Sequence, residues 1–213
     1  MAVGTKEALN LTNKRDPELT RRRLLKAGTK LFAVKGRDGT SVDEICQASG
    51  VNCRMIYHYF GSKDALYMAV LEEVYGRIRE LVVKSEPKPP SIAEYIDNLT
   101  ERYFRFLQAN PEFVSILRWE NASGAEGIRQ LDLDNFRGLY FEEASSVLGE
   151  EAGKQVTAEK SLMIILSCCS LCGYYFSNKA SLSHVFGTEL NDKDFAEQWL
   201  THIKQVLLTY YAD

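Results

Sequence analysis

Apolar residues recur every three or four positions along most of the chain, which is the spacing of one face of an α-helix. Residues 24–34 and 66–78 show this pattern most clearly. No stretch of useful length alternates apolar and polar residues as a half-buried β-strand does, and no internal repeat is present. The pattern predicts an all-α fold with about nine helices.

Caps, glycines and prolines set the expected ends of these helices. Asp16 and Pro17 are a suitable N-cap and first helical residue, and Gly36 ends the helix that they begin. Three prolines between residues 87 and 90 end a long helix over residues 62–84. We expect the remaining helices over residues 91–109, 110–123, 126–148, 154–178 and 192–210.

Residues 40–63 combine short helices with a tight turn. Ser41 and Glu44 form a capping box that opens a helix, and Gly50 allows the turn because glycine adopts positive φ at little cost. A second helix then covers Cys53–Tyr59. This arrangement is typical of a helix-turn-helix, which places its second helix in the major groove of DNA.

An ordinary corner between two helices is the alternative. The second helix argues against it, because it is short and carries Arg54, Tyr57, His58 and Tyr59 together. These side chains have the length and the polar groups to reach phosphates and base edges. We therefore interpret residues 40–63 as DNA-binding.

Residues 17–75 resemble the N-terminal domain of the TetR family of transcriptional regulators. The matching residues are Arg23–Gly36, Gly39–Val42, Ile45, Ala48–Val51, Ile56–Phe60 and Ser62–Leu66. Arg37 departs from the family pattern, which usually has an aromatic residue there. Cys53, Arg54 and Met55 also depart from it, because small or hydroxylated residues are usual at these positions.

The sequence and the resemblance together predict three parts. They are a flexible basic arm over residues 1–15, a helix-turn-helix DNA-binding domain over residues 16–64, and a ligand-binding and dimerisation domain over residues 65–213. The resemblance further implies a homodimer, a palindromic operator in double-stranded DNA, and a small-molecule effector that releases the DNA.

The expected DNA contacts follow from side-chain chemistry and from the matched family positions. Arg54 can form two hydrogen bonds to a guanine, and Cys53 and His58 can face neighbouring bases. The whole set that we expect at the DNA is Thr40, Ser41, Asn52, Cys53, Arg54, Tyr57, His58, Tyr59 and Lys63. Residues 21–23 should add salt-sensitive attraction. The residues expected to pack inside the domain are Ile45, Val51, Ile56 and Phe60.

Charge is distributed unevenly along the 213 residues, whose net charge is −3. Residues 1–64 hold twelve Lys and Arg against seven Asp and Glu, whereas residues 65–213 hold fourteen against twenty-two. A basic N-terminal part suits a protein that touches a polyanion with one end. A solvated imbalance without function would give the same numbers.

The most apolar segment, residues 162–176, is too short to cross a membrane and contains several small polar residues, so we expect a buried helix. The N-terminus has no apolar run typical of a signal peptide. We therefore expect a cytoplasmic protein whose five cysteines are all thiols.

The last two helices suggest a dimer interface. One face of the last helix carries apolar residues at helical spacing, namely Phe195, Trp199, Ile203, Val206 and Tyr210. The preceding helix is apolar nearly all round, and Ser167, Ser170 and Gly173 would let another helix approach closely. The core of a single chain could also cover these faces. The resemblance favours the dimer, because these helices usually build the four-helix bundle of the family.

The family also implies a ligand cavity among the middle helices. Its candidate lining is mainly apolar with a few polar anchors, as small-molecule sites usually are. The candidates are Tyr103, Phe104, Leu107, Phe113, Leu117, Trp119, Glu120, Asn121, Phe136, Tyr140, Cys169, Cys172 and Tyr175. Residues of this kind are more often ordinary core than ligand contacts.

Enzymatic function is not expected. The chain has only three histidines and lacks the short motifs of metalloproteases, serine hydrolases and P-loop proteins. We expect no cofactor and no metal. The preferred hypothesis is a ligand-responsive repressor. The alternatives are a regulator that senses oxidants or electrophiles through Cys168, Cys169 or Cys172, and a helical small-molecule binding protein without DNA binding.

Overall fold

The computed structural model describes residues 16–83, 89, 91–133 and 158–211. These residues form eight α-helices and one short 3-10 helix, and they confirm the all-α fold. The helices are α1 (Pro17–Lys35), α2 (Val42–Ser49), α3 (Arg54–Phe60), α4 (Lys63–Val83), α5 (Ile92–Ala109), α6 (Pro111–Ala122), η1 (Ile128–Gln130), α8 (Ala158–Phe186) and α9 (Lys193–Tyr211).

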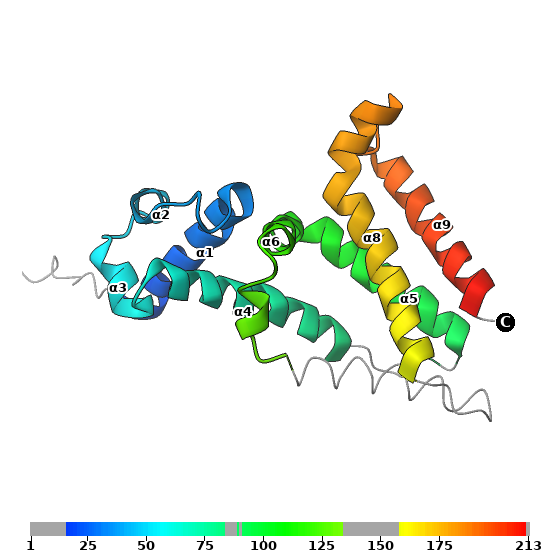
Figure 1. Cartoon of the computed structure of the whole chain (residues 1–213), viewed down its shortest axis with the longest axis horizontal. Helices are drawn as coiled ribbons and strands as arrows, with labels where there is room; N and C mark the ends of the chain where they lie inside the picture. Colours follow the sequence, from blue (N-terminus) through cyan, green and yellow to red (C-terminus); the bar gives the residue numbers. More distant parts are fainter. Residues whose placement is uncertain (1–15, 84–88, 90, 134–157, 212–213) are drawn as a thin grey trace, which may run out of the picture.

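The helices form two groups. α1, α2 and α3 gather at one end of the molecule, while α5, α8 and α9 lie at the other end (Figure 1). α4 runs from the first group towards the second, and α6 lies between them and contacts α1. We call residues 16–64 the head and the described residues from 65 onward the body.

The head begins with a well-capped helix. The Asp16 carboxylate accepts hydrogen bonds from the backbone N–H groups of Glu18 and Leu19 at 3.0 and 3.3 Å. Pro17 occupies the first helical position, where a missing N–H costs nothing. α1 ends at Gly36, whose φ of 70° is accessible to glycine, and the Trp119 ring lies about 3.0 Å from where a Cβ would stand. A larger residue at position 36 would therefore be strained and would clash.

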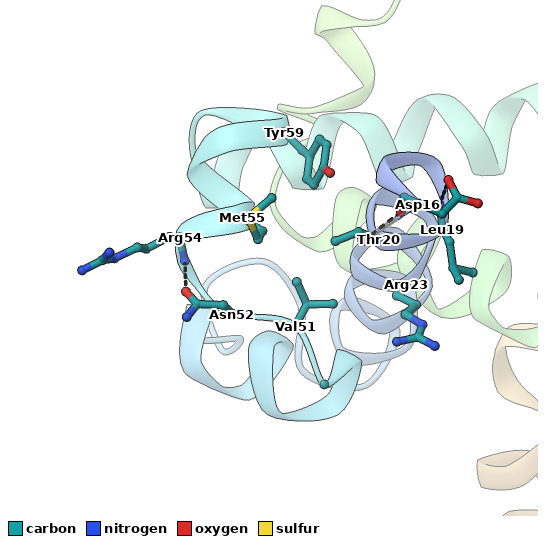
Figure 2. A pocket seen from close by; sticks show the side chains of 10 residues that line it. Asp16, Leu19, Thr20, Arg23, Val51, Asn52, Arg54, Met55 and Tyr59 are labelled. Atoms are coloured by element: carbon teal, nitrogen blue, oxygen red, sulfur yellow. Dashed lines mark hydrogen bonds between the residues drawn. The ribbon is translucent and has the colours of Figure 1, made fainter. Parts of the chain in front are cut away.

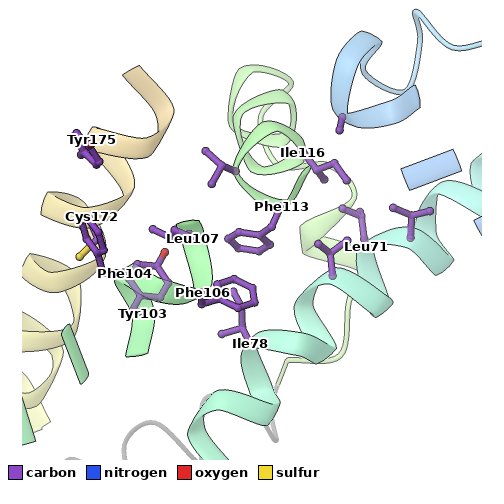
Figure 3. Packing of buried hydrophobic residues seen from close by; sticks show 14 of the residues in the cluster. Leu71, Ile78, Tyr103, Phe104, Phe106, Leu107, Phe113, Ile116, Cys172 and Tyr175 are labelled. Atoms are coloured by element: carbon purple, nitrogen blue, oxygen red, sulfur yellow. The ribbon is translucent and has the colours of Figure 1, made fainter. Parts of the chain in front are cut away.

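The body has an aromatic core between α4, α5, α6 and α8 (Figure 3). The rings of Phe106 and Phe113 meet edge to face with centroids 5.2 Å apart. Phe104 stacks on Tyr175 at 5.9 Å, which joins α5 to α8. Offset and edge-to-face pairs of this kind add to the stabilisation that burial provides. The core is continuous with that of the head.

The predicted helix ends were wrong in two places. α8 continues to Phe186 rather than ending near residue 178, and the mostly polar residues 179–184 lie within its last turns. The helix expected to start at residue 126 does not form there. Residues 126–133 are turns and the 3-10 helix η1, because Gly127 and Ile128 donate their N–H groups to Glu120. The remainder of that predicted helix, residues 134–148, lies outside the described residues.

The expectation that residues 162–176 form a buried helix was correct for one face only. Ile164, Cys168 and Cys172 are fully buried, whereas Leu166 and Tyr174 are exposed. By length and composition α8 could also cross a membrane, but the core helices of soluble proteins meet the same test. Here α8 packs against α5, α6 and α9.

Candidate nucleic-acid interface

The local signals at residues 40–63 produce the expected helix-turn-helix. Ser41 Oγ accepts from the Glu44 N–H at 3.2 Å, and the Glu44 carboxylate accepts from the Ser41 N–H at 2.9 Å. Gly50 follows α2 with φ 66° and ψ 23°, and its N–H bonds to carbonyls of the last turn. α3 begins at Arg54, one residue later than predicted, because Cys53 is its N-cap.

α3 turns one side towards the core and another towards solvent. Ile45 and Ile56 are fully buried between the helices, and Val51 and Phe60 are partly buried against them, as expected. Asn52, Arg54, Tyr57 and His58 are exposed, and the Tyr57 side chain is 58% exposed despite its aromatic ring. These four exposed residues all belong to the larger set that the sequence predicted to contact DNA.

Most of the other residues predicted to contact DNA are buried or already form contacts within the protein. Thr40 is buried, and its hydroxyl donates to the Gly36 carbonyl at 2.8 Å. Lys63 donates to the carbonyls of Arg37 and Thr40 at 2.9 and 3.0 Å, so its charge ties α4 to the α1–α2 loop. Tyr59 is partly buried beside His58, with ring centroids 4.9 Å apart. Ser41 remains exposed on the same loop as Thr40.

A pocket of about 530 Å³ opens between the start of α1 and α3 (Figure 2). Arg23 lines it from α1, opposite Asn52 and Met55, and Arg54 extends outward from its rim. The neighbouring arginines of α1 have other roles. Arg21 lies over the Phe60 ring at 5.2 Å, and Arg22 is 3.8 Å from the Glu18 carboxylate. Of the three arginines at residues 21–23, Arg23 is the one that lines the pocket beside α3. The sequence alone could not distinguish it from the other two.

The expectation of five thiols was wrong for two cysteines. Cys46 on α2 and Cys53 at the N-cap of α3 form a disulfide, with their Cα atoms 5.3 Å apart. The tight turn at Gly50 brings the residues together although seven positions separate them. Cys53, which we expected to face a base, has its sulfur directed towards α2 instead.

Cys168, Cys169 and Cys172 are free thiols on α8. The hydrogen bond with Cys172 and burial raise the pKa of Cys168 well above its usual range. Burial raises the pKa of Cys169 to about 12. Because the thiolate is the reactive form, these environments oppose oxidation or alkylation.

Two of the candidate ligand-site residues, Trp119 from the apolar lining and Glu120 from the polar anchors, lie where the head meets the body. Trp119 is 42% exposed, and its indole N–H donates to the Ala33 carbonyl at 3.2 Å. Glu120 is buried, and its carboxylate accepts from the Tyr67 hydroxyl at 2.6 Å and from the Gly127 and Ile128 N–H groups, each at 2.9 Å. We call this set, with Ala33, the junction.

Glu120 and burial together hold Tyr67 in its protonated form. Burial of the phenol is the larger cause, and the hydrogen bond to the Glu120 carboxylate is the second, and both raise the Tyr67 pKa above its usual range. Arg37, which stands where the family has an aromatic residue, lies 6.0 Å above the Tyr67 ring and pairs with Glu126 at 3.3 Å. Sequence reasoning missed Tyr67 and the pairing of Arg37 with Glu126, because the partners are 53 and 89 positions apart. It missed Gly127, seven positions from Glu120, because that residue was expected inside a helix.

The other ligand candidates lie mostly inside the body. Figure 3 shows several of them converging between α5, α6 and α8. Buried members are Tyr103, Phe104, Leu107, Phe113, Cys172 and Tyr175. Leu117 and Cys169 are partly buried, and Asn121 is exposed. Phe136 and Tyr140 lie outside the described residues.

The predicted dimer face divides between core and surface. Ile203 is fully buried in its own chain, while Phe195 and Trp199 are partly buried beside Tyr175, each ring 6.2 Å from it. Val206 and Tyr210 are 42% and 77% exposed. With Leu166, Ser167 and Ser170 of α8 they line an open groove of about 810 Å³, in which Gly173 has no part. We call this the α8–α9 groove.

Comparison with known families covers both parts of the chain. Residues 24–70 match the family described as "Bacterial regulatory proteins, tetR family". Residues 93–207 match the family described as "Tetracyclin repressor-like, C-terminal domain". The two matches lie on either side of the second half of α4.

Individual relatives agree with the family matches. The chain is 33% identical to the HTH-type transcriptional repressor NicS of Pseudomonas putida over 195 residues, which is 89% of this chain and 91% of that one. It is 25% identical to the HTH-type transcriptional regulator RutR of Escherichia coli over 210 residues, which is 96% of this chain and 97% of that one. Both relatives are matched over nearly their whole length.

Solved structures show the same fold at low sequence identity. The fatty acid degradation regulator FadR of Bacillus halodurans superposes with a TM-score of 0.66 at 19% identity, covering 89% of this chain and 94% of that one. FadR of Bacillus subtilis, solved in complex with stearoyl-CoA, gives 0.61 at 15% identity, covering 87% and 96%.

Proposed function

The chain belongs to the TetR family of DNA-binding transcriptional regulators, and we propose on this premise that it is a homodimeric repressor of a palindromic operator. α3 of each subunit reads one half-site, and a small molecule bound in the body releases the DNA. The observation that carries the proposal is the cluster of exposed side chains Asn52, Arg54, Tyr57 and His58 on the recognition helix.

Arg54 is the residue on which sequence recognition should depend most. Its side chain is exposed and extends away from the head (Figure 2), and no ion pair joins it to another residue that the structure describes. An exposed guanidinium of this kind can bond guanine O6 and N7 in the major groove. Tyr57 and His58 are also exposed on α3, and they would contact phosphates or other bases. Arg23, across the pocket on α1, is placed to meet the DNA backbone.

The test is binding of the purified protein to the DNA that flanks its own gene. Arg54→Ala should weaken binding to this DNA by about 1–3 kcal/mol and relax the preference at one base pair of each half-site. Arg118→Ala is the matched control, because Arg118 is an exposed arginine on α6 of the body. Equal losses on specific and random DNA would instead make Arg54 a phosphate contact.

The dimer is supported by the apolar surface that a single chain leaves uncovered. Val206 and Tyr210 of α9 and Leu166 of α8 are exposed around the α8–α9 groove. The small side chains of Ser167 and Ser170 line this groove, so that helices of a second copy could approach α8 closely. A two-fold dimer matches a palindromic site, since helix-turn-helix proteins bind half-sites about one DNA turn apart.

The effector site is proposed among the aromatic side chains that join α5 to α8, around Tyr103, Phe104 and Tyr175. The junction then connects this region with the head, because α6 carries both Trp119 and Glu120. A shift of α6 would act on α1 through Trp119 and on α4 through Tyr67. Effector and operator must weaken each other by the same factor, since the coupling is reciprocal.

The alternatives have less support. The raised pKa values of Cys168 and Cys169 oppose a thiol sensor in the body. A binding protein without DNA affinity would not need polar side chains exposed along α3. The family consists of regulators rather than enzymes, and we place the protein in the cytoplasm, where its DNA is.

A further inference from the structure

The helix-turn-helix contains a pair of cysteines that none of the roles described so far uses. Cys46 lies in the last turn of α2 and is buried, whereas Cys53 caps α3 and is partly exposed. Their disulfide links the two helices that define the DNA-binding geometry. The bridge lies immediately before Arg54, the first residue of α3.

We propose that Cys46 and Cys53 are a redox modification site. A hydroperoxide forms the disulfide there, and the disulfide increases the affinity of the head for DNA. The inference rests on the proposed function in one respect, namely that α3 contacts DNA. It differs from the alternative hypothesis of a thiol sensor in the body, because the responding cysteines lie in the head.

The chemistry is balanced with a hydroperoxide as the only oxidant. The thiolate of the accessible Cys53 attacks the hydroxyl oxygen of the peroxide, and the O–O bond breaks to give a Cys53 sulfenic acid. The alkoxide that leaves takes up the proton that the Cys53 thiol released on ionisation, which gives an alcohol, or water from hydrogen peroxide. The Cys46 thiol then attacks the Cys53 sulfur. The S–S bond forms, and the hydroxyl leaves as water with the Cys46 proton. A dithiol reductant reverses the step by exchange.

The residues between the two cysteines are already held by hydrogen bonds, so the reduced head should stay folded. The Cys46 carbonyl accepts from the Val51 N–H at 3.3 Å, and the Asn52 side chain accepts from the Arg54 N–H at 3.0 Å. Around the same turn, the Cys53 carbonyl accepts from the Ile56 N–H at 3.1 Å. The bridge therefore restricts motion of an existing turn and creates no new one.

Restricting this turn should favour DNA binding. Binding requires α3 to hold one orientation in the major groove, and a recognition helix that is already fixed loses less freedom when it binds. A bridge also removes conformations from the unfolded chain, which stabilises the head. Both effects have the same sign: the bridged protein should bind more tightly and melt at a higher temperature.

The experiment compares the full-length protein after treatment with a dithiol and after treatment with cumene hydroperoxide. Peptide mapping should show Cys46 joined to Cys53, with Cys168, Cys169 and Cys172 still reduced. Binding to DNA flanking the gene should then be roughly three- to tenfold tighter, and the melting temperature should rise. Cys46→Ser should behave like the reduced wild type under both conditions, and Cys46→Ala replaces it if the serine variant does not fold.

Two results would overturn the proposal: no Cys46–Cys53 linkage after peroxide treatment, or a linkage that leaves both DNA affinity and melting temperature unchanged. A response that survives in the Cys46 variants would also contradict it. If neither the oxidised nor the reduced protein binds the flanking DNA, the proposed operator is wrong. In that case random-sequence DNA replaces it, and the same change in affinity is expected.

Discussion

Glu44 shows how one side chain serves both a helix and its neighbour. It closes the capping box of α2 with Ser41 and also forms an ion pair with Lys35 at the end of α1. The hydrogen bond from Lys35, followed by those from Ser41, lowers the pKa of Glu44 to about 2. Its charged form therefore favours the folded head.

The sign of this shift gives a pH prediction. The contribution of Glu44 is complete above the ordinary glutamate pKa of about 4.3 and is lost as the pH falls towards 2. A carbon-13 NMR titration of the Glu44 carboxyl should give a pKa near 2 in the wild type. In Lys35→Met the value should rise the most, and in Ser41→Ala it should rise less. A pKa that does not move in Lys35→Met would contradict the assigned cause.

At this scale the sequence predicted partners close along the chain and missed distant ones. Ser41 and Glu44 are three positions apart, so the spacing alone indicated their bond. Lys63, which we expected at the DNA, instead bonds carbonyls 26 and 23 positions earlier. To predict the disulfide between Cys46 and Cys53, one would have to know the angle between α2 and α3. That angle depends on how Val51 and Ile56 pack. The sequence predicted that both residues lie inside the domain, but it did not predict the angle that results.

At the scale of whole helices, too, features set by nearby residues could be predicted and those set by distant contacts could not. The head helices could be predicted because caps and glycines mark their ends. The structure after α6 could not be predicted in this way. There the N–H groups of Gly127 and Ile128 donate hydrogen bonds to the Glu120 carboxylate, and this prevents an α-helix from starting at residue 126. A glutamate beside Trp119 suggested a ligand anchor, but the Tyr67 hydroxyl that completes its set of donors is 53 positions away.

The junction predicts a specific loss of stability. Tyr67→Phe removes one of three donors to the buried Glu120 carboxylate, and hydrogen bonds to charged groups contribute about 1.5–3 kcal/mol. We expect the free energy of unfolding in urea to fall by about that amount. Tyr75→Phe is the matched control, since Tyr75 also lies on α4 but does not donate to Glu120. Equal losses for the two variants would show that the Tyr67 hydroxyl has no special role.

The whole molecule combines a basic DNA-binding end with an apolar surface at the other end. The positive charge of residues 1–64 and the negative charge of residues 65–213 could be counted from the sequence, and so could the apolar α8 and α9. Which side of each helix stays uncovered could not. Ile203 was expected in the dimer face but is fully buried, whereas Leu166 was not expected there and is exposed.

This surface predicts how the molecule assembles. Val206→Glu places a charge at the α8–α9 groove, where a second copy would remove it from water without a partner, and such burial is costly. Because Val206 is 42% exposed in the single chain, the fold itself should survive. Light scattering should show a monomer for Val206→Glu, and a dimer for the wild type and for Val34→Glu, whose site on α1 is 74% exposed.

Loss of the dimer should then weaken operator binding more than loss of any single contact. Two linked heads bind the second half-site at a high effective concentration, and avidity of this kind is worth roughly 10²- to 10⁴-fold. The affinity of Val206→Glu for the flanking DNA should fall within that range, while its circular dichroism stays helical. A dimeric Val206→Glu protein with unchanged affinity would mean that the two copies meet elsewhere, and that the exposed side of α8 and α9 has another purpose.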